Sequence, residues 1–219
     1  SRDGKLWVAA NLEKKIVKTE LLEVILKKGC RILNLCHSTT LGTLSSNIKS
    51  QLRVLNLSQP VEGNIAALED LLFSCSSLQE LVLQDVVLTP KMAVSICENG
   101  KTLEKLNLNS SDVEILWVTC YPFSYFQEII KCCQELKEVD LAFVNLKEGL
   151  TDEDLEFLTK NINPNIEKLN LSSTSYVTDS DIKILLSRCN KIKALTVEAR
   201  NINVDSWKNI KQRLKLTLL

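Results

Sequence analysis

The chain has 219 residues, of which 45% are apolar and 25% are charged, an ordinary profile for a globular protein. Its 27 basic and 27 acidic residues cancel, which disfavours the coating of a nucleic-acid duplex or attachment to a membrane surface. No apolar run approaches the roughly 20 residues of a membrane-spanning helix. The first residues also lack the apolar core of a signal peptide. We therefore expect no nucleic-acid partner and no membrane partner.

A six-residue phrase recurs along the chain: a large apolar residue, two variable residues, an apolar residue, one variable residue and a last apolar residue. Six clear copies begin at residues 52, 78, 103, 136, 166 and 192, and two weaker copies begin at residues 7 and 30. A period near 25 residues with this phrase is typical of leucine-rich repeats. The predicted fold class is α/β, a leucine-rich-repeat horseshoe. It would be a right-handed solenoid with a parallel sheet on its concave side and helices on its convex side.

The elements of each repeat can be placed from local signals. The three apolar residues of a phrase should point into the core, and Leu81, Leu106 and Leu169 are the clearest inward leucines. Over residues 41–47 we expect a turn or a short 3₁₀ segment, because the 22-residue spacing there is too short for a full helix. Hydroxyl, amide or carboxylate groups that cap a helix N-terminus precede five apolar-periodic stretches. These capping residues are Asn64, Thr89, Thr151, Thr178 and Asp205.

Eight cysteines and one histidine, His37, give no zinc-binding spacing, since the chain has no C-x-x-C pair. A four-cysteine site assembled across repeats stays open but has no supporting pattern. Cys75, Cys133 and Cys189 each stand three residues before a strand phrase, so we expect buried, unpaired thiols with a packing role. This use of cysteine favours a reducing compartment, cytoplasmic or nuclear. We expect no metal and no cofactor.

The sequence also gives no convincing pattern for a catalytic site. Cys36 and His37 are adjacent, and neighbours on a strand point to opposite faces, so a thiol–imidazole pair is geometrically poor. The acidic clusters at 152–154 and 179–181 stand where helix caps are expected. The neighbouring thiols Cys132 and Cys133 should be one exposed and one buried. We therefore expect a non-catalytic protein.

The residues between the inward leucines should form rows on the concave face. One expected row is Asn34, Asn56, Val82, Asn107, Asp140, Asn170 and Thr196. The next is Cys36, Ser58, Gln84, Asn109, Ala142, Ser172 and Glu198. Small polar groups with free donors and acceptors suit an extended peptide or a partner loop, although such residues could equally just tolerate a crowded sheet face. The candidate partner-binding residues are Asn56, Asn107, Asn109, Asp140, Lys168, Asn170 and Glu198.

Aromatic residues concentrate in the longest repeat, between residues 117 and 126. Trp117 and Tyr121, in its inserted part, are candidate loop anchors for a partner, because aromatic side chains often dominate protein interfaces. The alternative, which we favour for the cluster as a whole, is that Phe126 packs the helix behind the sheet together with Ile129 and Ile130. The other aromatics would then cover that helix.

Two longer motifs are more specific. C-x-x-L-x-x-L-x-L occurs at 75–83, with one Val at 133–141 and, with Ile and Val, at 189–197, and T-D-x-x-L/I-x-x-L occurs at 151–158 and 178–185. Together they resemble the cysteine-containing leucine-rich repeats of F-box proteins. The chain departs from that family three residues after the last strand leucine, where a cysteine is common. Those positions hold Pro60, Val86, Ser111, Val144, Thr174 and Arg200.

The D-G-K-L-W sequence at residues 3–7 is similar to the segment that joins an F-box to the first repeat. The resemblance thus implies a linker remnant at 1–6 and a solenoid of about eight repeats at 7–219. It also implies the substrate-recognition part of a cullin-type E3 ubiquitin ligase, holding a target protein on the concave face for ubiquitination. The ligase core would be reached only through an F-box that is not present in this chain. The alternative is a free-standing leucine-rich-repeat protein that binds, blocks or scaffolds a protein partner.

Overall fold

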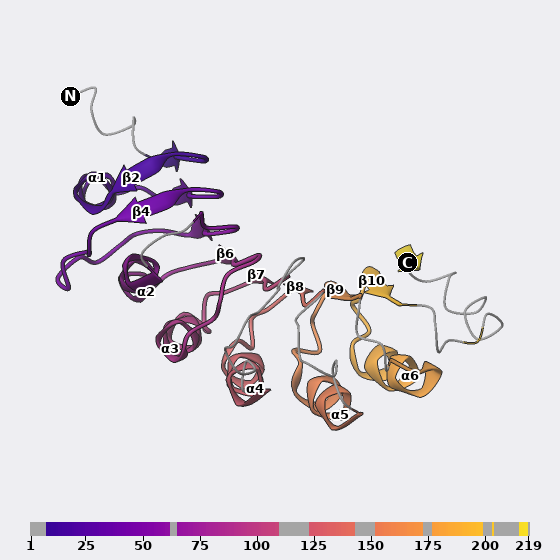
Figure 1. Cartoon of the computed structure of the whole chain (residues 1–219). Coiled ribbons are helices and arrows are strands. Elements are labelled where there is room, and N and C mark those ends of the chain that lie inside the picture. The colour runs from indigo at the N-terminus through magenta and orange to yellow at the C-terminus, as the bar shows by residue number, and fades with distance from the viewer. Residues whose placement is uncertain are drawn as a thin grey trace.

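The computed structural model describes residues 8–61, 65–109, 123–142, 152–172, 177–198, 203 and 215–218, with only the backbone described at 123–126, 152–155 and 215–218. Strands and helices alternate along most of this chain, and the strands of the main sheet are parallel. In Figure 1 the strands follow a curved row, and the helices lie along its outer side. The predicted α/β class with a parallel sheet is confirmed.

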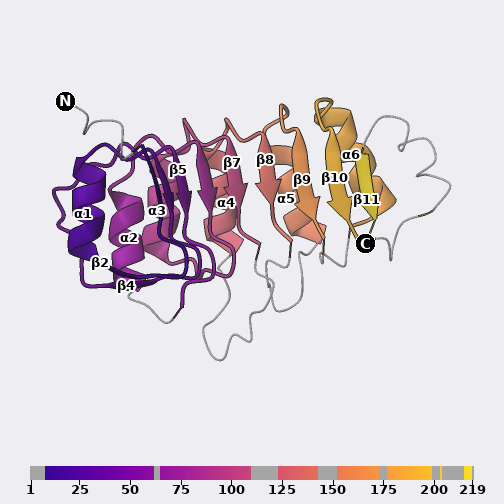
Figure 2. The ribbon, with the colours of Figure 1, turned by 90° about the horizontal axis from the view of Figure 1, so that it is seen from above.

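The main sheet follows the order of the chain, so each strand lies beside the strand of the preceding repeat (Figure 2). In the described part it has nine strands in the order β1-β3-β5-β6-β7-β8-β9-β10-β11, and it does not close on itself. Their bounds are β1 Ala9–Asn11, β3 Ile32–Asn34, β5 Val54–Asn56, β6 Glu80–Val82, β7 Lys105–Asn107, β8 Glu138–Asp140, β9 Lys168–Leu171, β10 Ala194–Val197 and β11 Lys215–Leu218.

Neighbouring strands pair without any offset between equivalent positions of the repeat. Leu55 stands beside Leu81, Leu81 beside Leu106, and Leu106 beside Val139. Each is at most 3% exposed, as is Leu169 further along the sheet. The predicted inward register is therefore confirmed. Burial of each such side chain contributes about 1.5–3 kcal/mol to folding.

Helices cover one face of the sheet and bury an apolar stripe against it (Figures 1 and 2). Their bounds are α1 Thr19–Lys27, α2 Ile65–Phe73, α3 Pro90–Glu98, α4 Phe123–Cys132, α5 Asp152–Asn161 and α6 Asp179–Arg188. Two predicted caps are confirmed: the Thr89 hydroxyl accepts a hydrogen bond from the Met92 backbone N–H, and Thr178 forms a capping box with Asp181. Predicted caps that lie outside the described residues are Asn64, Thr151 and Asp205.

The three repeated cysteines are buried free thiols, as predicted. Each thiol donates to a backbone carbonyl, at 3.2 Å from Leu71 O for Cys75 and at 3.8 Å from Ile96 O for Cys133. Burial raises the pKa of Cys75 to about 11 and the pKa of Cys133 to about 12, so both stay protonated at neutral pH. Next to Cys133, Cys132 is exposed, which confirms the expected contrast between the two.

Between β3 and β5 the chain forms no helix, in agreement with the prediction for 41–47. It forms instead a strand that the sequence analysis missed, β4 Thr39–Leu41, which pairs in parallel with β2 Ile16–Lys18 in a separate small sheet. The chain after β4 is tied to α1 through Glu23. The backbone N–H and the hydroxyl of Ser45 both donate to Glu23 Oε1, at 3.0 and 2.6 Å.

Protonation of Glu23 at low pH should weaken its hydrogen bonds with Ser45. The pKa of Glu23 is lowered from 4.5 to about 2, first by the hydrogen bonds from Ser45 and then by Lys27. A pKa that is lower in the folded chain means that the carboxylate stabilises the fold above about pH 4.5 and loses that effect as the pH falls toward 2.

We predict that the difference in free energy of unfolding between the wild type and Glu23→Gln is present at pH 6 and shrinks steadily below about pH 4.5. Urea titrations across this range measure it. Glu20→Gln is the control. Glu20 lies on the first turn of the same helix, and the hydrogen bonds from Ser45 go to Glu23. A difference for Glu23→Gln that stays constant with pH would contradict the assignment.

The inward register can be tested by truncation. We predict that Leu106→Ala lowers the free energy of unfolding by about 2–5 kcal/mol, because Leu106 is 2% exposed and its removal leaves a cavity between strands and helices. Val94→Ala on α3, where the side chain is 56% exposed, should change it by about 0.5 kcal/mol or less. Denaturant titration of both variants decides the matter, and equal effects would mean that the register is misplaced.

Candidate functional site

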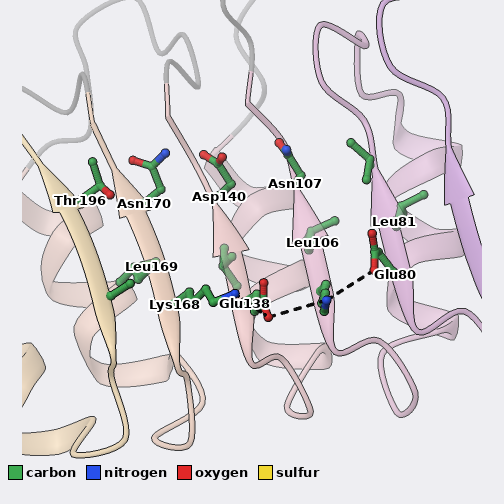
Figure 3. Close-up of a pocket in the computed structure, with 14 residues that line it drawn as sticks. Glu80, Leu81, Leu106, Asn107, Glu138, Asp140, Lys168, Leu169, Asn170 and Thr196 are labelled. Atoms are coloured by element: carbon green, nitrogen blue, oxygen red, sulfur yellow. Dashed lines mark ion pairs between the residues drawn. The ribbon is translucent and has the colours of Figure 1, made fainter. Parts of the chain in front are cut away.

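The face of the sheet that carries no helices holds an open depression of about 360 Å³. It runs across β6, β7, β8, β9 and β10 and is lined by the side chains of these strands (Figure 3). Of the predicted partner-binding residues, Asn107, Asp140, Lys168 and Asn170 line this depression together. Five strands from five successive repeats therefore contribute to one continuous surface.

Asparagine and aspartate stand at the ends of the strands for a local reason. The side-chain oxygen of each accepts a hydrogen bond from the backbone N–H two residues later, as Asn107 does from Asn109 at 2.8 Å and Asp140 from Ala142 at 3.0 Å. Asn56 and Asn170 do the same toward Ser58 and Ser172. These side chains satisfy backbone donors where the strand ladder ends.

This finding corrects the expectation that the whole row offers free acceptors. The oxygen of each asparagine is already used by its own backbone, and in Asn56 and Asn170 it also accepts from the serine hydroxyl two residues later, at 2.6 and 2.8 Å. The asparagines of the row therefore present mainly their amide donors to a partner, whereas the carboxylate of Asp140 can only accept. In the part of the chain that the structure describes, the amide Nδ2 groups of Asn107 and Asn170 have no hydrogen-bond partner.

The second predicted row is wrong as a set of exposed residues. Ser58, Ala142 and Ser172 are buried, at 4%, 1% and 2% exposure, because the chain turns inward after each strand instead of continuing the alternation. Asn109 and Glu198 lie in these segments beyond the strand ends and are partly exposed. Asn109 keeps its side-chain oxygen buried without a hydrogen-bond partner among the described residues.

The turn after each early strand holds one residue in the left-handed backbone region. Lys14, His37, Gln59 and Asp85 occupy equivalent places, with φ between 51° and 57°. Cys36 and His37 thus lie in such a turn, so the expectation that they are strand neighbours is wrong. Burial is the largest of the effects that raise the pKa of the Cys36 thiol. A raised pKa leaves less of the nucleophilic thiolate at neutral pH.

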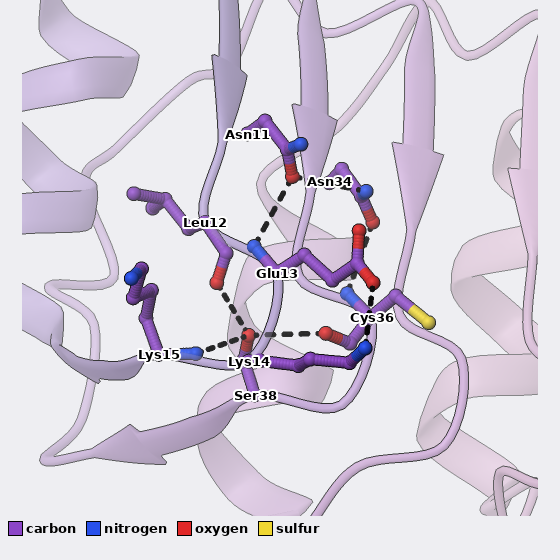
Figure 4. A network of polar contacts seen from close by, with 8 residues as sticks. All are labelled: Asn11, Leu12, Glu13, Lys14, Lys15, Asn34, Cys36 and Ser38. Atoms are coloured by element: carbon purple, nitrogen blue, oxygen red, sulfur yellow. Dashed lines mark hydrogen bonds and ion pairs between the residues drawn. The ribbon is translucent and has the colours of Figure 1, made fainter.

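Figure 4 shows how this turn is held in the first two repeats. The Asn11 side-chain oxygen accepts from the Glu13 backbone N–H and from Asn34 Nδ2, each at 3.1 Å. The Ser38 hydroxyl donates to the Leu12 carbonyl at 2.6 Å and accepts from the Lys15 backbone N–H at 3.4 Å. Polar side chains of one repeat therefore fix the turn of the preceding repeat and give the rim of the sheet a set shape.

Charged residues alternate across the depression, a feature that the sequence analysis missed apart from Lys168. Lys105 Nζ lies 3.6 Å from Glu80 and 3.7 Å from Glu138, and Lys168 Nζ lies 3.1 Å from Glu138 (Figure 3). We call Glu80, Lys105, Glu138 and Lys168 the charge ladder. These side chains are between 32% and 57% exposed, so each pair contributes about 0–1 kcal/mol. The main effect of the ladder is that opposite charges cancel along the surface.

A second alternating set lies at the residues directly before strands β7 to β10. Lys137 Nζ is 3.0 Å from Glu104, and Lys193 Nζ is 2.5 Å from Glu167. The hydrogen bond from Lys193 lowers the pKa of Glu167. Each strand start thus carries a Glu-Lys or Lys-Glu pair in the opposite order to its neighbour, at 104–105, 137–138 and 167–168. This alternation was the sequence signal, visible once the repeats are aligned.

The remaining predicted residues are dispersed. Asn56 lies on β5, next to the strands that line the depression, and Asn109 and Glu198 lie past the strand ends. Trp117 and Tyr121 fall outside the described residues. Within the described ranges, no three His, Cys, Asp or Glu residues are placed to hold a metal ion, and no helix is long and apolar enough to cross a membrane.

In sequence, the chain matches no protein-family model. It also has no significant match among curated proteins.

The strand-ending role of Asn107 makes a sharp prediction. Asn107→Ala should lower the free energy of unfolding by about 1–3 kcal/mol, because the Asn109 N–H loses its acceptor. Asn107→Ser keeps a side-chain oxygen that can accept from the Asn109 N–H without placing a second charge beside Asp140, and it should lose less stability. Denaturant titration of the two variants is the measurement. If both variants lose the same free energy of unfolding, the hydrogen bond to the side-chain oxygen of residue 107 does not stabilise the fold.

Proposed function

We propose that the chain is a leucine-rich-repeat horseshoe, a right-handed solenoid whose concave side is the parallel sheet. Three observations support this proposal. The strand phrase recurs with a period near 25 residues, the strands pair in the order of the chain, and the helices lie on the outer side of a curved row (Figure 1). The predicted division into a linker remnant at 1–6 and repeats at 7–219 is part of this proposal.

We further propose that the concave face binds a protein partner. The observation that carries this proposal is the depression across β6–β10, where polar and charged side chains from five strands face the same space. A broad, open surface of this kind suits a protein segment that contacts several repeats at once. The helices occupy the opposite face, which leaves the sheet as the extended polar surface.

The chemistry of the surface favours an uncharged, acceptor-rich partner. Along the charge ladder each lysine lies beside a glutamate of the next strand, and Asp140 adds one further negative charge, so the depression has no strong net charge to attract a highly charged partner. Amide donors at Asn107 and Asn170 suit the carbonyl oxygens of an extended peptide backbone. Nucleic acid, which requires a basic surface, is disfavoured by the same balance.

The ligase role is proposed from the resemblance to F-box leucine-rich-repeat proteins. We propose that residues 55–111 and 161–195 correspond to repeats of S-phase kinase-associated F-box protein 2, on the motifs quoted above and without a sequence match to a curated protein. On this proposal, the chain is the non-catalytic substrate receptor of a cullin-type E3 ubiquitin ligase in the cytoplasm or nucleus. An F-box outside this chain would bind the ligase core. The alternative is a free-standing repeat protein that binds, blocks or scaffolds its partner by the same face.

A matched set of variants tests the binding face. Asp140→Asn removes the charge but keeps an oxygen for the Ala142 N–H, and Thr196→Lys adds bulk and charge at the next-but-one strand. Lys183→Glu on exposed α6 is the convex control. We predict that tagged protein carrying the first two changes together loses its co-purified proteins at least tenfold, measured by quantitative mass spectrometry, while the control retains them.

Circular dichroism and thermal melting of the same variants check that all of them fold. Loss of the co-purified proteins with Lys183→Glu, and their retention with the concave pair, would overturn the assignment of the binding face. The ligase link has its own test, namely co-purification of the full-length product of the transcript with a purified ligase adaptor subunit. If the variant with Asp140→Asn and Thr196→Lys loses its co-purified proteins but the full-length protein does not bind the adaptor subunit, the free-standing alternative is supported.

A further inference from the structure

Two thiols lie close together on the helices that follow β6 and β7, and neither contributes to the depression. Cys97 is near the end of α3, and Cys132 is the last residue of α4. The two helices pack against each other. Cys97 is partly buried and Cys132 is exposed, and both are free thiols. The pair thus has one sulfur open to solvent and one sheltered sulfur on the neighbouring helix.

The backbones at the two helix ends are held unusually close together. A Cβ added to Gly100, just beyond α3, would come within 2.6 Å of the Cys132 carbonyl oxygen and 3.0 Å of the Cys97 carbonyl oxygen. Only a residue without a side chain leaves room for this approach. Gly100 therefore lets the end of α4 sit directly against the end of α3, and it has the backbones of both Cys97 and Cys132 as its neighbours.

Cys132 also affects the titration of Cys97. The pKa of Cys97 is raised to about 12, first by burial and then by the neighbouring Cys132. A third thiol, Cys133, is buried and donates to the Ile96 carbonyl at 3.8 Å. Cys97 is therefore a poor nucleophile by itself but stands next to the exposed sulfur that an oxidant reaches first.

We propose that Cys97 and Cys132 are a redox-active pair that closes to a disulfide between α3 and α4 when the protein meets a hydroperoxide. The Cys132 sulfur attacks the peroxide, its O–O bond breaks, and Cys132 becomes a sulfenic acid while one water or alcohol leaves. The Cys97 sulfur then attacks the sulfenic sulfur. The S–S bond forms, the S–O bond breaks, and the oxygen leaves as water with the Cys97 proton. The two thiols lose two electrons and two protons in total, and a dithiol reverses the reaction.

The experiment uses the purified chain and hydrogen peroxide as the probe. After treatment, remaining thiols are blocked with N-ethylmaleimide, and the protein is digested without reduction and mapped by mass spectrometry. We expect one intramolecular cross-link that joins the peptides of Cys97 and Cys132 and disappears with dithiothreitol. The cross-link ties two neighbouring repeats, so the oxidised chain should melt higher than the reduced chain by roughly 5–15 °C.

Single substitutions separate this mechanism from general oxidation. Cys132→Ser should abolish the cross-link, whereas Cys97→Ser should leave Cys132 as a sulfenic acid that dimedone labels. Cys36→Ser, a partly exposed thiol in another repeat, and Cys120→Ser, outside the described residues, should both leave the cross-link unchanged.

Four results would overturn the proposal. They are a cross-link that uses Cys120 or any other thiol, a disulfide between two chains on a non-reducing gel, over-oxidation of Cys132 without any cross-link, and an oxidised chain that melts no higher than the reduced one.

Discussion

The structure depends on one constraint: a short strand of the main sheet buries its central apolar residue only with the strand of the next repeat beside it. The described strands are three or four residues long, and an inward side chain gains a closed environment between the equivalent residues of two neighbours, as Leu81 does between Leu55 and Leu106. The backbone hydrogen bonds that join the strands fix this alignment without offset. Local pairing is therefore both the source of the core and the reason why all repeats share one register.

The shared register also decides what the exposed face looks like. Residues at the same position in successive repeats become cross-strand neighbours. The residue type at a position in one repeat therefore affects the stability of the residue beside it in the next repeat. Glu80, Lys105, Glu138 and Lys168 occupy one such place, and their alternating charges attract where equal charges would repel. The side-chain oxygens of Asn107 and Asp140 occupy another, and they end the strands by taking up backbone donors. The candidate surface is thus built largely from groups that already serve the fold.

The sequence predicted what is local or strictly periodic. The inward leucines follow from alternation within a strand, and the caps at Thr89 and Thr178 follow from a hydroxyl before an apolar stretch. It did not predict β4, because that strand exists only through its pairing with β2. The charge ladder was missed because it appears only when residues 25 to 33 positions apart are placed side by side. The asparagine row was correctly located but misread, since its side chains turn back onto their own backbone.

The curvature links the candidate surface to the helices behind it. Neighbouring strands lie about 4.8 Å apart, whereas packed helices need about 8–10 Å, so a row of strand-and-helix units must bend with its helices outside. The bend in turn sets how closely the side chains of β6 to β10 that line the depression approach one another. The helices α3 and α4 connect strands that line this depression, and Gly100 already brings their ends into close contact. A bond between Cys97 and Cys132 would fix the distance between α3 and α4 at their ends. A change in that distance would also alter the positions of β6, β7 and β8 on the inner face, because hydrogen bonds hold these strands together.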